Sequence, residues 1–249
     1  DNNNRLYYAD LGDPKRTAIG APVKPFVEDD DAEFNVFGNV GSTLYLRTDR
    51  SAPNRKVMAI DVRRPEPSAW KTVVPEGKEA IESVTLIGGR IVAQYLVDVQ
   101  SKLSLFGLDG AAQGDVMLPG AGTGASFGGR EDDPEVIFTF SSPLFPTTVF
   151  SYDPGVKKST PFEAPTPPID VNQFETKQLF AASKDGTKVP FFLTARKGLT
   201  LDGSHPAMLY GYGGFSITTL RSNERLSHNL SPLTWGLNEV MQFAEVLLN

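Results

Sequence analysis

The sequence contains no cysteine and only two histidines, His205 and His228, among its 249 residues. Without cysteine the chain forms no disulfide and has no thiolate nucleophile and no Cys-ligated zinc or iron–sulfur site. Two histidines allow at most one His-dependent catalytic centre. The chain also lacks the run of about 18 apolar residues that a membrane helix needs. Its first ten residues, DNNNRLYYAD, do not show the charged-then-apolar pattern of a signal peptide.

An excess of positive charge is also missing. The chain has 24 basic and 30 acidic residues, a net charge of −6, and no block of basic residues. Such a chain is a poor ligand for a phosphate backbone. We therefore expect neither nucleic acid nor a membrane as a partner, and we expect no cofactor and no metal. The predicted location is the cytoplasm, with the periplasm as the alternative.

What the sequence does contain is turn chemistry and short β-type segments. The 23 glycines and 19 prolines separate apolar runs rich in Val, Ile, Phe, Tyr and Thr, which favour strands. Four segments repeat one pattern of strand, Asp or Gly turn, and second strand: RLYYADLGD from Arg5, KVMAIDVRR from Lys56, KLSLFGLDG from Lys102 and TVFSYDPGV from Thr148. Another strong strand precedes each of the last three, at 43–49, 90–98 and 135–142.

The starts of these four segments are 51, 46 and 46 residues apart. A period of about 40–50 residues that contains about four strands is typical of β-propeller blades, which stack radially because one blade cannot bury both faces alone. A β-sandwich with accidental spacing is the alternative. About three to four blades fit into residues 1–165, fewer than many closed rings need, so we expect the chain to be part of a longer protein.

A second domain is predicted to begin after the proline-rich segment PFEAPTPPID (161–170), and we assign it residues 166–249. Two alternating runs then flank Asp185-Gly186, a strong hairpin signal. Further on, the apolar run 207–210 leads directly into the Gly-rich loop 211–215. A buried strand that opens into such a loop is where α/β enzymes place function.

The loop Gly211-Tyr212-Gly213-Gly214-Phe215 allows two interpretations on its residues alone. The glycines permit close backbone approach, so a phenol held there could donate to a developing oxyanion. Alternatively, the loop is a tight turn whose aromatic side chains pack in the core. It does not match the dinucleotide-binding pattern.

Other candidate residues favour structural roles. Ser126 lies in GASFG, the spelling of a nucleophile elbow, but turn-rich sequence surrounds it where the motif requires a strand and a helix. We predict that it lies between two blades and is not a nucleophile. We expect His205 to form hydrogen bonds within a loop and His228 to lie on the solvated surface. The acidic run 28–33 is predicted to be a solvated loop, because it lacks the ligand spacing of a calcium site.

Three stretches of the sequence resemble the prolyl oligopeptidase family of serine peptidases. The most specific is KDGTKVPFFLTARKGLTLDGSHPAMLYGYGGF (184–215), and residues 44–76 and 138–153 support it. The resemblance implies a partial β-propeller followed by the beginning of an α/β-hydrolase domain, and hydrolysis of short peptides after proline. It further implies that the Tyr212 hydroxyl forms half of the oxyanion hole and that Phe215 is an aromatic wall of the proline pocket. Short proline-containing peptides are then the expected partners.

The sequence departs from the family pattern after about Ile217. The Gly-Gly-Ser-Asn-Gly-Gly nucleophile elbow and the later Asp and His of the triad are not found. Residues 218–249 match only loosely, and Val240, Phe243, Ala244 and Leu247 have helical spacing. We therefore expect a fragment of a serine endopeptidase that is inactive alone. The alternative is a non-catalytic propeller module that binds peptides.

Overall fold

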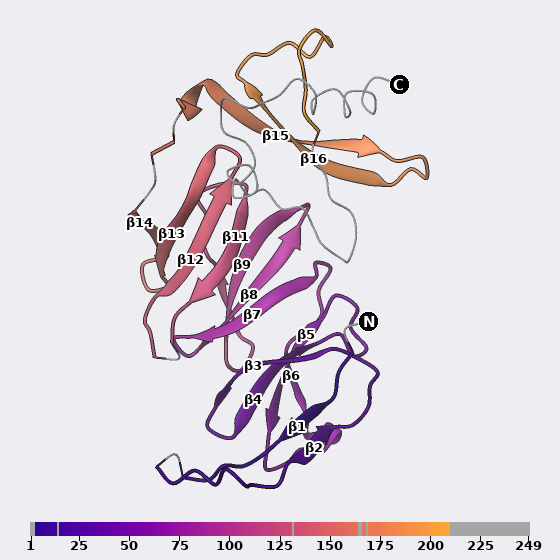
Figure 1. The fold of residues 1–249 in the computed structure, drawn as a ribbon, viewed down its shortest axis with the longest axis vertical. Helices are drawn as coiled ribbons and strands as arrows, with labels where there is room; N and C mark the ends of the chain where they lie inside the picture. Colours follow the sequence, from indigo (N-terminus) through magenta and orange to yellow (C-terminus); the bar gives the residue numbers. More distant parts are fainter. Residues whose placement is uncertain (1–2, 14, 131, 164–165, 168, 210–249) are drawn as a thin grey trace. The chain divides into compact units, whose positions relative to one another are not determined.

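The computed structural model describes residues 3–13, 15–130, 132–163, 166–167 and 169–209 (Figure 1). In these ranges the chain is built of β-strands, with two short 3-10 turns, η1 (Pro67–Ala69) and η2 (Val171–Gln173). No helix there is long and apolar enough to cross a membrane. The chain divides into two compact units. Unit 1 comprises residues 1–95, 103–115 and 129–134, and unit 2 comprises residues 96–102, 116–128 and 135–249.

Three four-stranded antiparallel sheets follow one another along the chain. The first contains β3 (Phe34–Val40), β4 (Thr43–Thr48), β5 (Lys56–Asp61) and β6 (Lys71–Val74). The second contains β7 (Ile81–Ile87), β8 (Arg90–Val97), β9 (Gln100–Gly107) and β10 (Ala112–Asp115). The third contains β11 (Thr123–Gly128), β12 (Val136–Ser142), β13 (Phe145–Asp153) and β14 (Lys158–Glu163). In each sheet every strand pairs with its neighbour in sequence, which is the meander of a propeller blade.

The predicted repeat corresponds to these meanders. The segments at 43–49, 90–98 and 135–142 form β4, β8 and β12, the second strand of each sheet. The repeats from Lys56, Lys102 and Thr148 contain residues of the third strands and lead into the fourth. The repeat from Arg5 forms β1 (Leu6–Tyr8), which pairs with β2 (Lys24–Val27) in a sheet of two strands. The prediction of a mainly β chain with propeller blades is confirmed.

Strands β4 and β5 of unit 1 are buried on both faces. Their alternate side chains divide between two clusters, because successive residues of a strand point to opposite sides of a sheet. Tyr45, Val57 and Ala59 pack with β7 and β8 residues such as Ile81 and Ile91. On the other face lie Leu46, Met58 and Ile60, together with Val27 and Phe34. A blade enclosed between two neighbours explains why the sequence of β5 is almost continuously apolar.

One glycine shows how closely the first two sheets approach. Gly110, in the turn before β10, has φ +90°. A Cβ at this position would lie 1.9 Å from the carbonyl oxygen of Val73 in β6. Only a residue without a side chain fits there. The Asp-Gly turn of the third repeat therefore serves blade packing as well as the turn.

The third sheet, in unit 2, has an aromatic core. The rings of Phe138 and Phe150 are stacked with centroids 5.3 Å apart, and Phe140 meets Phe145 edge to face at 5.5 Å. Phe138 and Phe140 are almost fully buried. These rings come from the adjacent strands β12 and β13, in which Phe138 is directly opposite Phe150. The pairing explains the dense phenylalanine pattern of residues 138–150.

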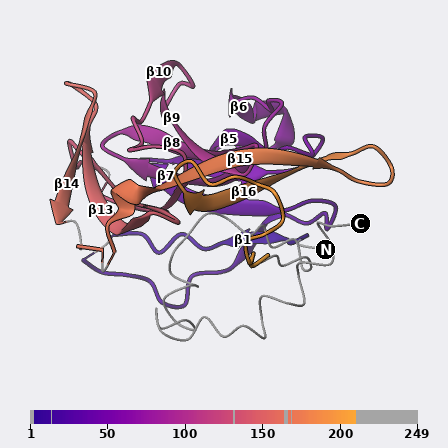
Figure 2. The ribbon, with the colours of Figure 1, turned by 90° about the horizontal axis from the view of Figure 1, so that it is seen from above.

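The last described sheet is the two-stranded hairpin of β15 (Phe174–Ala182) and β16 (Lys188–Arg196). Figure 2 shows it as a long, narrow ribbon. The strands pair from Phe174↔Arg196 to Ala182↔Lys188. In the turn, Gly186 has φ +85°, and the Asp185 carboxylate accepts a hydrogen bond from the Thr187 N–H at 3.0 Å. The hairpin that Asp185-Gly186 predicts is therefore confirmed.

Candidate functional site

Tyr212 and Phe215, the two site residues that the sequence singles out, lie outside the described residues. The same holds for His228 and for the predicted helical stretch 240–247. Their roles stay predictions. The described chain ends at Leu209, two residues before the Gly-rich loop.

The strand predicted just before that loop is not found in its described part. Residues 207–209 form no strand, Ala207 is exposed, and Met208 and Leu209 are only half-buried. A buried parallel strand requires neighbouring strands and covered faces, and the described residues supply neither around these three positions. This expectation is not met.

His205 lies in the exposed loop between β16 and residue 207. Close by, the Asp202 carboxylate accepts hydrogen bonds from the Ser204 hydroxyl at 2.6 Å and from the Ser204 N–H at 2.9 Å. These hydrogen bonds stabilise the charged form and lower the pKa of Asp202. The loop thus has the local hydrogen bonding of an Asx turn between Asp202 and Ser204.

Ser126 lies within β11, the first strand of the third sheet, and not in a connection between blades as predicted. The prediction of a loop was wrong because glycine-rich sequence reads as turn, whereas here β11 pairs with β12 through a register shift between Gly124 and Phe127. Bulges of this kind accommodate glycine in a strand. The next element in the chain is β12, not a helix, so the geometry of a nucleophile elbow is absent here.

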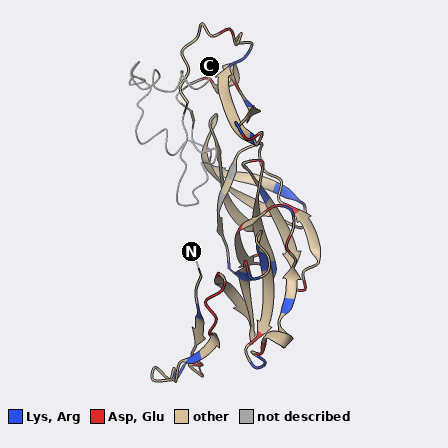
Figure 3. Cartoon of the chain, turned by 90° about the vertical axis from the view of Figure 1, so that its right-hand side faces the viewer, with Lys and Arg blue, Asp and Glu red and all other residues tan. Residues whose placement is uncertain are grey.

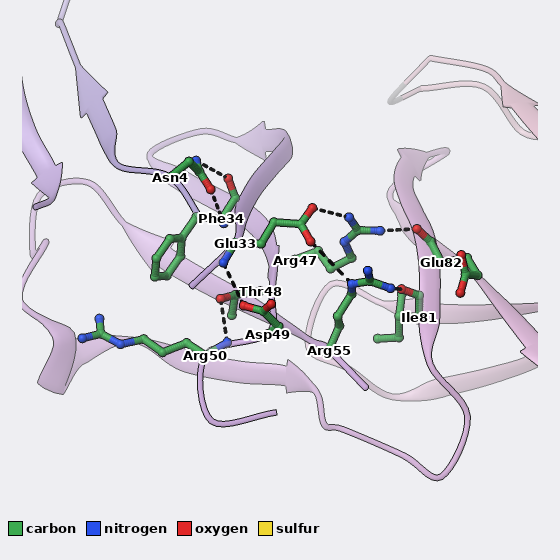
Figure 4. A network of polar contacts seen from close by, with 10 residues as sticks. All are labelled: Asn4, Glu33, Phe34, Arg47, Thr48, Asp49, Arg50, Arg55, Ile81 and Glu82. Carbon is green, nitrogen blue, oxygen red and sulfur yellow. Dashed lines mark hydrogen bonds and ion pairs between the residues drawn. The ribbon is translucent and has the colours of Figure 1, made fainter. Parts of the chain in front are cut away.

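A network of charged side chains lies in unit 1, and we call it the Glu33 network (Figure 4). It consists of Glu33, Arg47 and Arg55 with the backbone carbonyls of Ile81 and Glu82. Arg47 Nη2 donates to Glu33 Oε1 at 2.6 Å, and Arg55 Nε lies 3.5 Å from Glu33 Oε2. Arg55 Nη1 also donates to the Ile81 carbonyl at 3.1 Å, and Arg47 Nη1 donates to the Glu82 carbonyl.

The Glu33 network is largely removed from water. The side chains of Arg47 and Glu33 are 12% and 15% exposed. Further hydrogen bonds fix its surroundings: the Glu33 N–H donates to Asp49 Oδ1 at 2.8 Å, and the Asn4 amide exchanges two bonds with the backbone of Phe34. Within the described residues, Arg47 Nε is buried without a hydrogen-bond partner.

The position of the Glu33 network indicates a structural role. Glu33 directly precedes β3, the first strand of the first sheet. Ile81 and Glu82 begin β7, the first strand of the second sheet, so the network connects the beginnings of these two strands. β3 and β7 also contact each other, as the inner strands of adjacent blades do around a propeller axis. Its donors meet a carboxylate and two carbonyls, an arrangement that orients backbone and contains no nucleophile.

The Glu33 network is not predicted from the sequence. The run 28–33 reads as a solvated acidic loop, but Ala32 is buried and Glu33 nearly so. The remaining carboxylates of the run do face solvent, and Asp29 and Asp31 pair with Arg50. The available signal was the apolar Ala32 next to Glu33 at the start of a strand. The Arg partners are 14 and 22 residues away in sequence, so only the paired strands bring them together.

Charges of both signs occur along the described chain, as Figure 3 shows. Over the ranges that the structure describes, no group of three or more His, Cys, Asp or Glu side chains is arranged to hold a metal ion. The described geometry is that of a packed β-scaffold with a structural ion-pair network. The class of protein that these meanders and their packing define is a β-propeller protein.

Comparison with known proteins specifies the family. Residues 1–165 match the family described as "Prolyl oligopeptidase, N-terminal beta-propeller domain". The prolyl endopeptidase of Elizabethkingia meningoseptica is 32% identical over 217 residues, which are 87% of this chain and 30% of that protein. The dual function macrocyclase-peptidase POPB of Amanita bisporigera is 32% identical over 207 residues, 79% of this chain and 28% of that protein.

Solved structures of the same family are also similar to this chain. One chain, from a structural and mechanistic study of two prolyl endopeptidases, superposes with a TM-score of 0.79 at 31% identity and covers 89% of this chain and 32% of that chain. Prolyl oligopeptidase B of Galerina marginata, bound to a 35mer hydrolysis and macrocyclization substrate, gives a TM-score of 0.79 at 28% identity, with 89% and 31% covered. The chain belongs to the prolyl oligopeptidase family and spans about 30% of the length of the relatives it matches.

Proposed function

We propose that this chain works as part of a serine-type prolyl endopeptidase that hydrolyses short peptides on the carboxyl side of proline. The observation that carries the proposal is the length of the match. The alignment with a prolyl endopeptidase covers 217 residues, which exceeds the 165 residues of the propeller family and reaches into the hairpin region. The relation therefore extends beyond a propeller shared with other proteins.

Residues 166–249 are, in this proposal, the beginning of an α/β-hydrolase domain. The exposure of the β15–β16 hairpin supports this assignment. Phe180 and Val189 are about half exposed, although they lie in well-paired strands. A two-stranded hairpin is marginally stable alone and needs further strands or helices on its faces. A hydrolase sheet would provide them.

Tyr212 is the proposed oxyanion donor. When a serine attacks the scissile carbonyl, negative charge develops on the carbonyl oxygen, and a phenol aimed at that oxygen stabilises it by about 3 kcal/mol. Phe215 is the proposed wall of the pocket for the substrate proline, because a flat ring stacks well on a pyrrolidine ring. Tyr210, in the same stretch, is assigned a structural role. These roles follow from the resemblance of YGYGGF to the family loop.

The chain alone is proposed to be inactive. Acyl transfer of this type needs a nucleophilic serine, a base and an orienting acid, and the family motifs for these three residues are not found in the sequence. The structure supports this in two places: Ser126 lies in a blade strand, and His205 lies in an exposed loop. Short proline-containing peptides are the proposed substrates of the whole enzyme.

Two measurements test the proposal. The purified chain is assayed with a Gly-Pro-anilide substrate, and we expect no turnover above background. The coding DNA beyond the codon for Asn249 is then sequenced in all three frames. A Gly-Gly-Ser-Asn-Gly-Gly elbow followed by Asp and His supports the peptidase. A stop with no such motif downstream refutes it and favours the non-catalytic peptide-binding module.

Tyr212 is tested in the enzyme that includes the downstream triad. Tyr212→Phe removes only the phenolic hydroxyl, so we expect kcat to fall by roughly 10²–10³-fold with little change in KM. Tyr210→Phe is the matched control, because it removes the same group two residues away, and it should leave kcat unchanged. Equal losses in both variants would contradict the assignment of the oxyanion donor.

A further inference from the structure

The connection between β8 and β9 is a strained hairpin turn. Its two loop residues, Asp98 and Val99, have φ values of 47° and 62°. Two-residue loops with positive φ at both positions favour Asn-Gly, because glycine adopts this conformation without steric conflict. A β-branched residue in the left-handed region is an outlier. Such conformations persist where surrounding contacts hold them.

The side chain of Gln178 supplies contacts of this kind. It projects from β15 and is separated from the turn by 78–80 residues in sequence. Its Nε2 donates to the carbonyl oxygen of Asp98, and its Oε1 accepts from Gln100 Nε2 at 2.7 Å. One amide therefore bonds to the residues on either side of Val99. Residues 96–102 and the hairpin lie in the same compact unit, unit 2.

This contact joins two differently assigned parts of the chain. Asp98 and Gln100 belong to the residues that match the propeller family, whereas Gln178 lies beyond them. Gln178 is also half-buried in a strand whose neighbours at the distal end, Phe180 to Ala182, are exposed. These two hydrogen bonds of the Gln178 amide are thus a specific attachment in a hairpin that otherwise buries little.

We propose that Gln178 docks the β15–β16 hairpin onto the β8–β9 turn, and that docking holds Asp98 and Val99 in their left-handed conformation. Order in the turn and order in the hairpin are then coupled. The coupling itself requires no peptidase activity.

Amide hydrogen exchange, measured by mass spectrometry on the chain as it is, tests the coupling. Gln178→Met keeps the length of the side chain and removes both hydrogen bonds. We expect about tenfold faster exchange in two segments, 96–102 and 174–182, because local opening frees the groups that these bonds connect. Exchange in β3–β6 should not change. Gln113→Ala, in the exposed strand β10, is the control and should affect neither segment.

A second variant separates strain from docking. Val99→Gly removes the steric conflict at positive φ, so the turn keeps its shape without help. In the double variant Val99→Gly/Gln178→Met, slow exchange should return in 96–102 but not in 174–182. Faster exchange of only one segment in Gln178→Met overturns the coupling, as does no change in either. If Gln178→Met unfolds, β3–β6 also exchanges fast, and Gln100→Ala, which removes one of the two bonds, decides by the same criterion.

The outcome is independent of the proposed function. Coupled exchange with no downstream triad leaves the docking in place and removes the peptidase. An intact downstream triad with uncoupled exchange supports the peptidase and refutes the docking.

Discussion

The β3–β6 sheet and the β15–β16 hairpin are made of similar strands but differ in what stabilises them. The hairpin pairs without a register shift, whereas the blade has shifts between Val36 and Gly38 and between Val57 and Met58. The blade, although less regular, is the more deeply buried of the two: Ile60 in the blade is fully buried, whereas Phe180 in the hairpin is 52% exposed. Regular backbone pairing therefore does not by itself produce a core.

The difference lies in the neighbours. Each face of β4 and β5 contacts a separate apolar cluster, one with β7 and β8 and one with β1 and β2. The hairpin has a polar attachment through Gln178 and half-exposed faces. Net contributions of single hydrogen bonds are about 1 kcal/mol, whereas burying a large apolar side chain contributes about 1.5–3 kcal/mol. We therefore expect the blade to resist unfolding and the hairpin to open first.

The largest expected effect comes from a cavity in the blade. Ile60→Ala removes a side chain that is fully buried in the cluster with Leu46 and Met58. We expect the free energy of unfolding to fall by about 2–5 kcal/mol. Phe180→Ala in the hairpin is the matched change, and it should cost less than about 1 kcal/mol because the ring is already half in water. Urea denaturation measures both, and equal losses would show that the hairpin has a core of its own.

A smaller effect is expected at the Glu33 network. Arg47→Met removes the donors to Glu33 and to the Glu82 carbonyl, and leaves a nearly buried carboxylate with Arg55. Losing a hydrogen bond to a charged group costs about 1.5–3 kcal/mol. Part of that loss is offset because the buried Arg47 Nε is removed as well.

Arg63→Met is the control for this variant, because Arg63 pairs with Asp61 at the surface with its side chain 74% exposed. Its thermal unfolding temperature should hardly change, since exposed pairs contribute little. If Arg47→Met were as silent as Arg63→Met, the network would not hold β3 and β7 together.

The smallest effect concerns pH and the hairpin turn. Hydrogen bonds to the Asp185 carboxylate, first from the Thr187 N–H, lower the pKa of Asp185 below the ordinary value. A lowered folded-state pKa stabilises the turn above the ordinary aspartate pKa of about 3.9, and this stabilisation is lost as the pH falls through the lower folded value. Carbon-13 detected titration of the carboxyl should therefore show a midpoint below 3.9. A midpoint at the ordinary value would contradict the hydrogen-bonded turn.

In Asp185→Asn the acid-dependent fraying of the hairpin at its turn should disappear. The β3–β6 sheet, whose turns do not include Asp185, should keep its acid response. Comparing the β15–β16 hairpin with the β3–β6 sheet then distinguishes the contribution of the Asp185 carboxylate from the acid response of the whole chain.

Local patterns in the sequence predicted most of the strands. The repeat placed β4, β8 and β12, and Asp185-Gly186 placed the hairpin turn, because alternation and turn chemistry act within a few residues. The same local reasoning failed for Ser126, where glycines in a bulged strand resemble a loop, and for residues 207–209, where an apolar run is not a strand. Pairing with β12 makes the segment around Ser126 a strand. Residues 207–209 have no strand partner among the described residues.

The proposed catalytic residues show the same division. The spelling YGYGGF suggested Tyr212 and Phe215, since a resemblance needs only the order of residues. The Glu33 network and the Gln178 contact were not visible in the sequence, because Arg47 and Glu33, or Gln178 and Asp98, carry no mutual signal along the chain.

The sequence by itself determined that the chain is mainly β, that blade-like units recur every 46 to 51 residues, and to which family it is similar. These properties depend on side-chain alternation and on turn residues, which act over short distances. The tertiary structure alone decided that β4 and β5 are buried on both faces, that Glu33 bridges two arginines, and that Gln178 is hydrogen-bonded to the β8–β9 turn. Those outcomes depend on which segments meet after folding, and burial and charge pairing have their energetic effect only there.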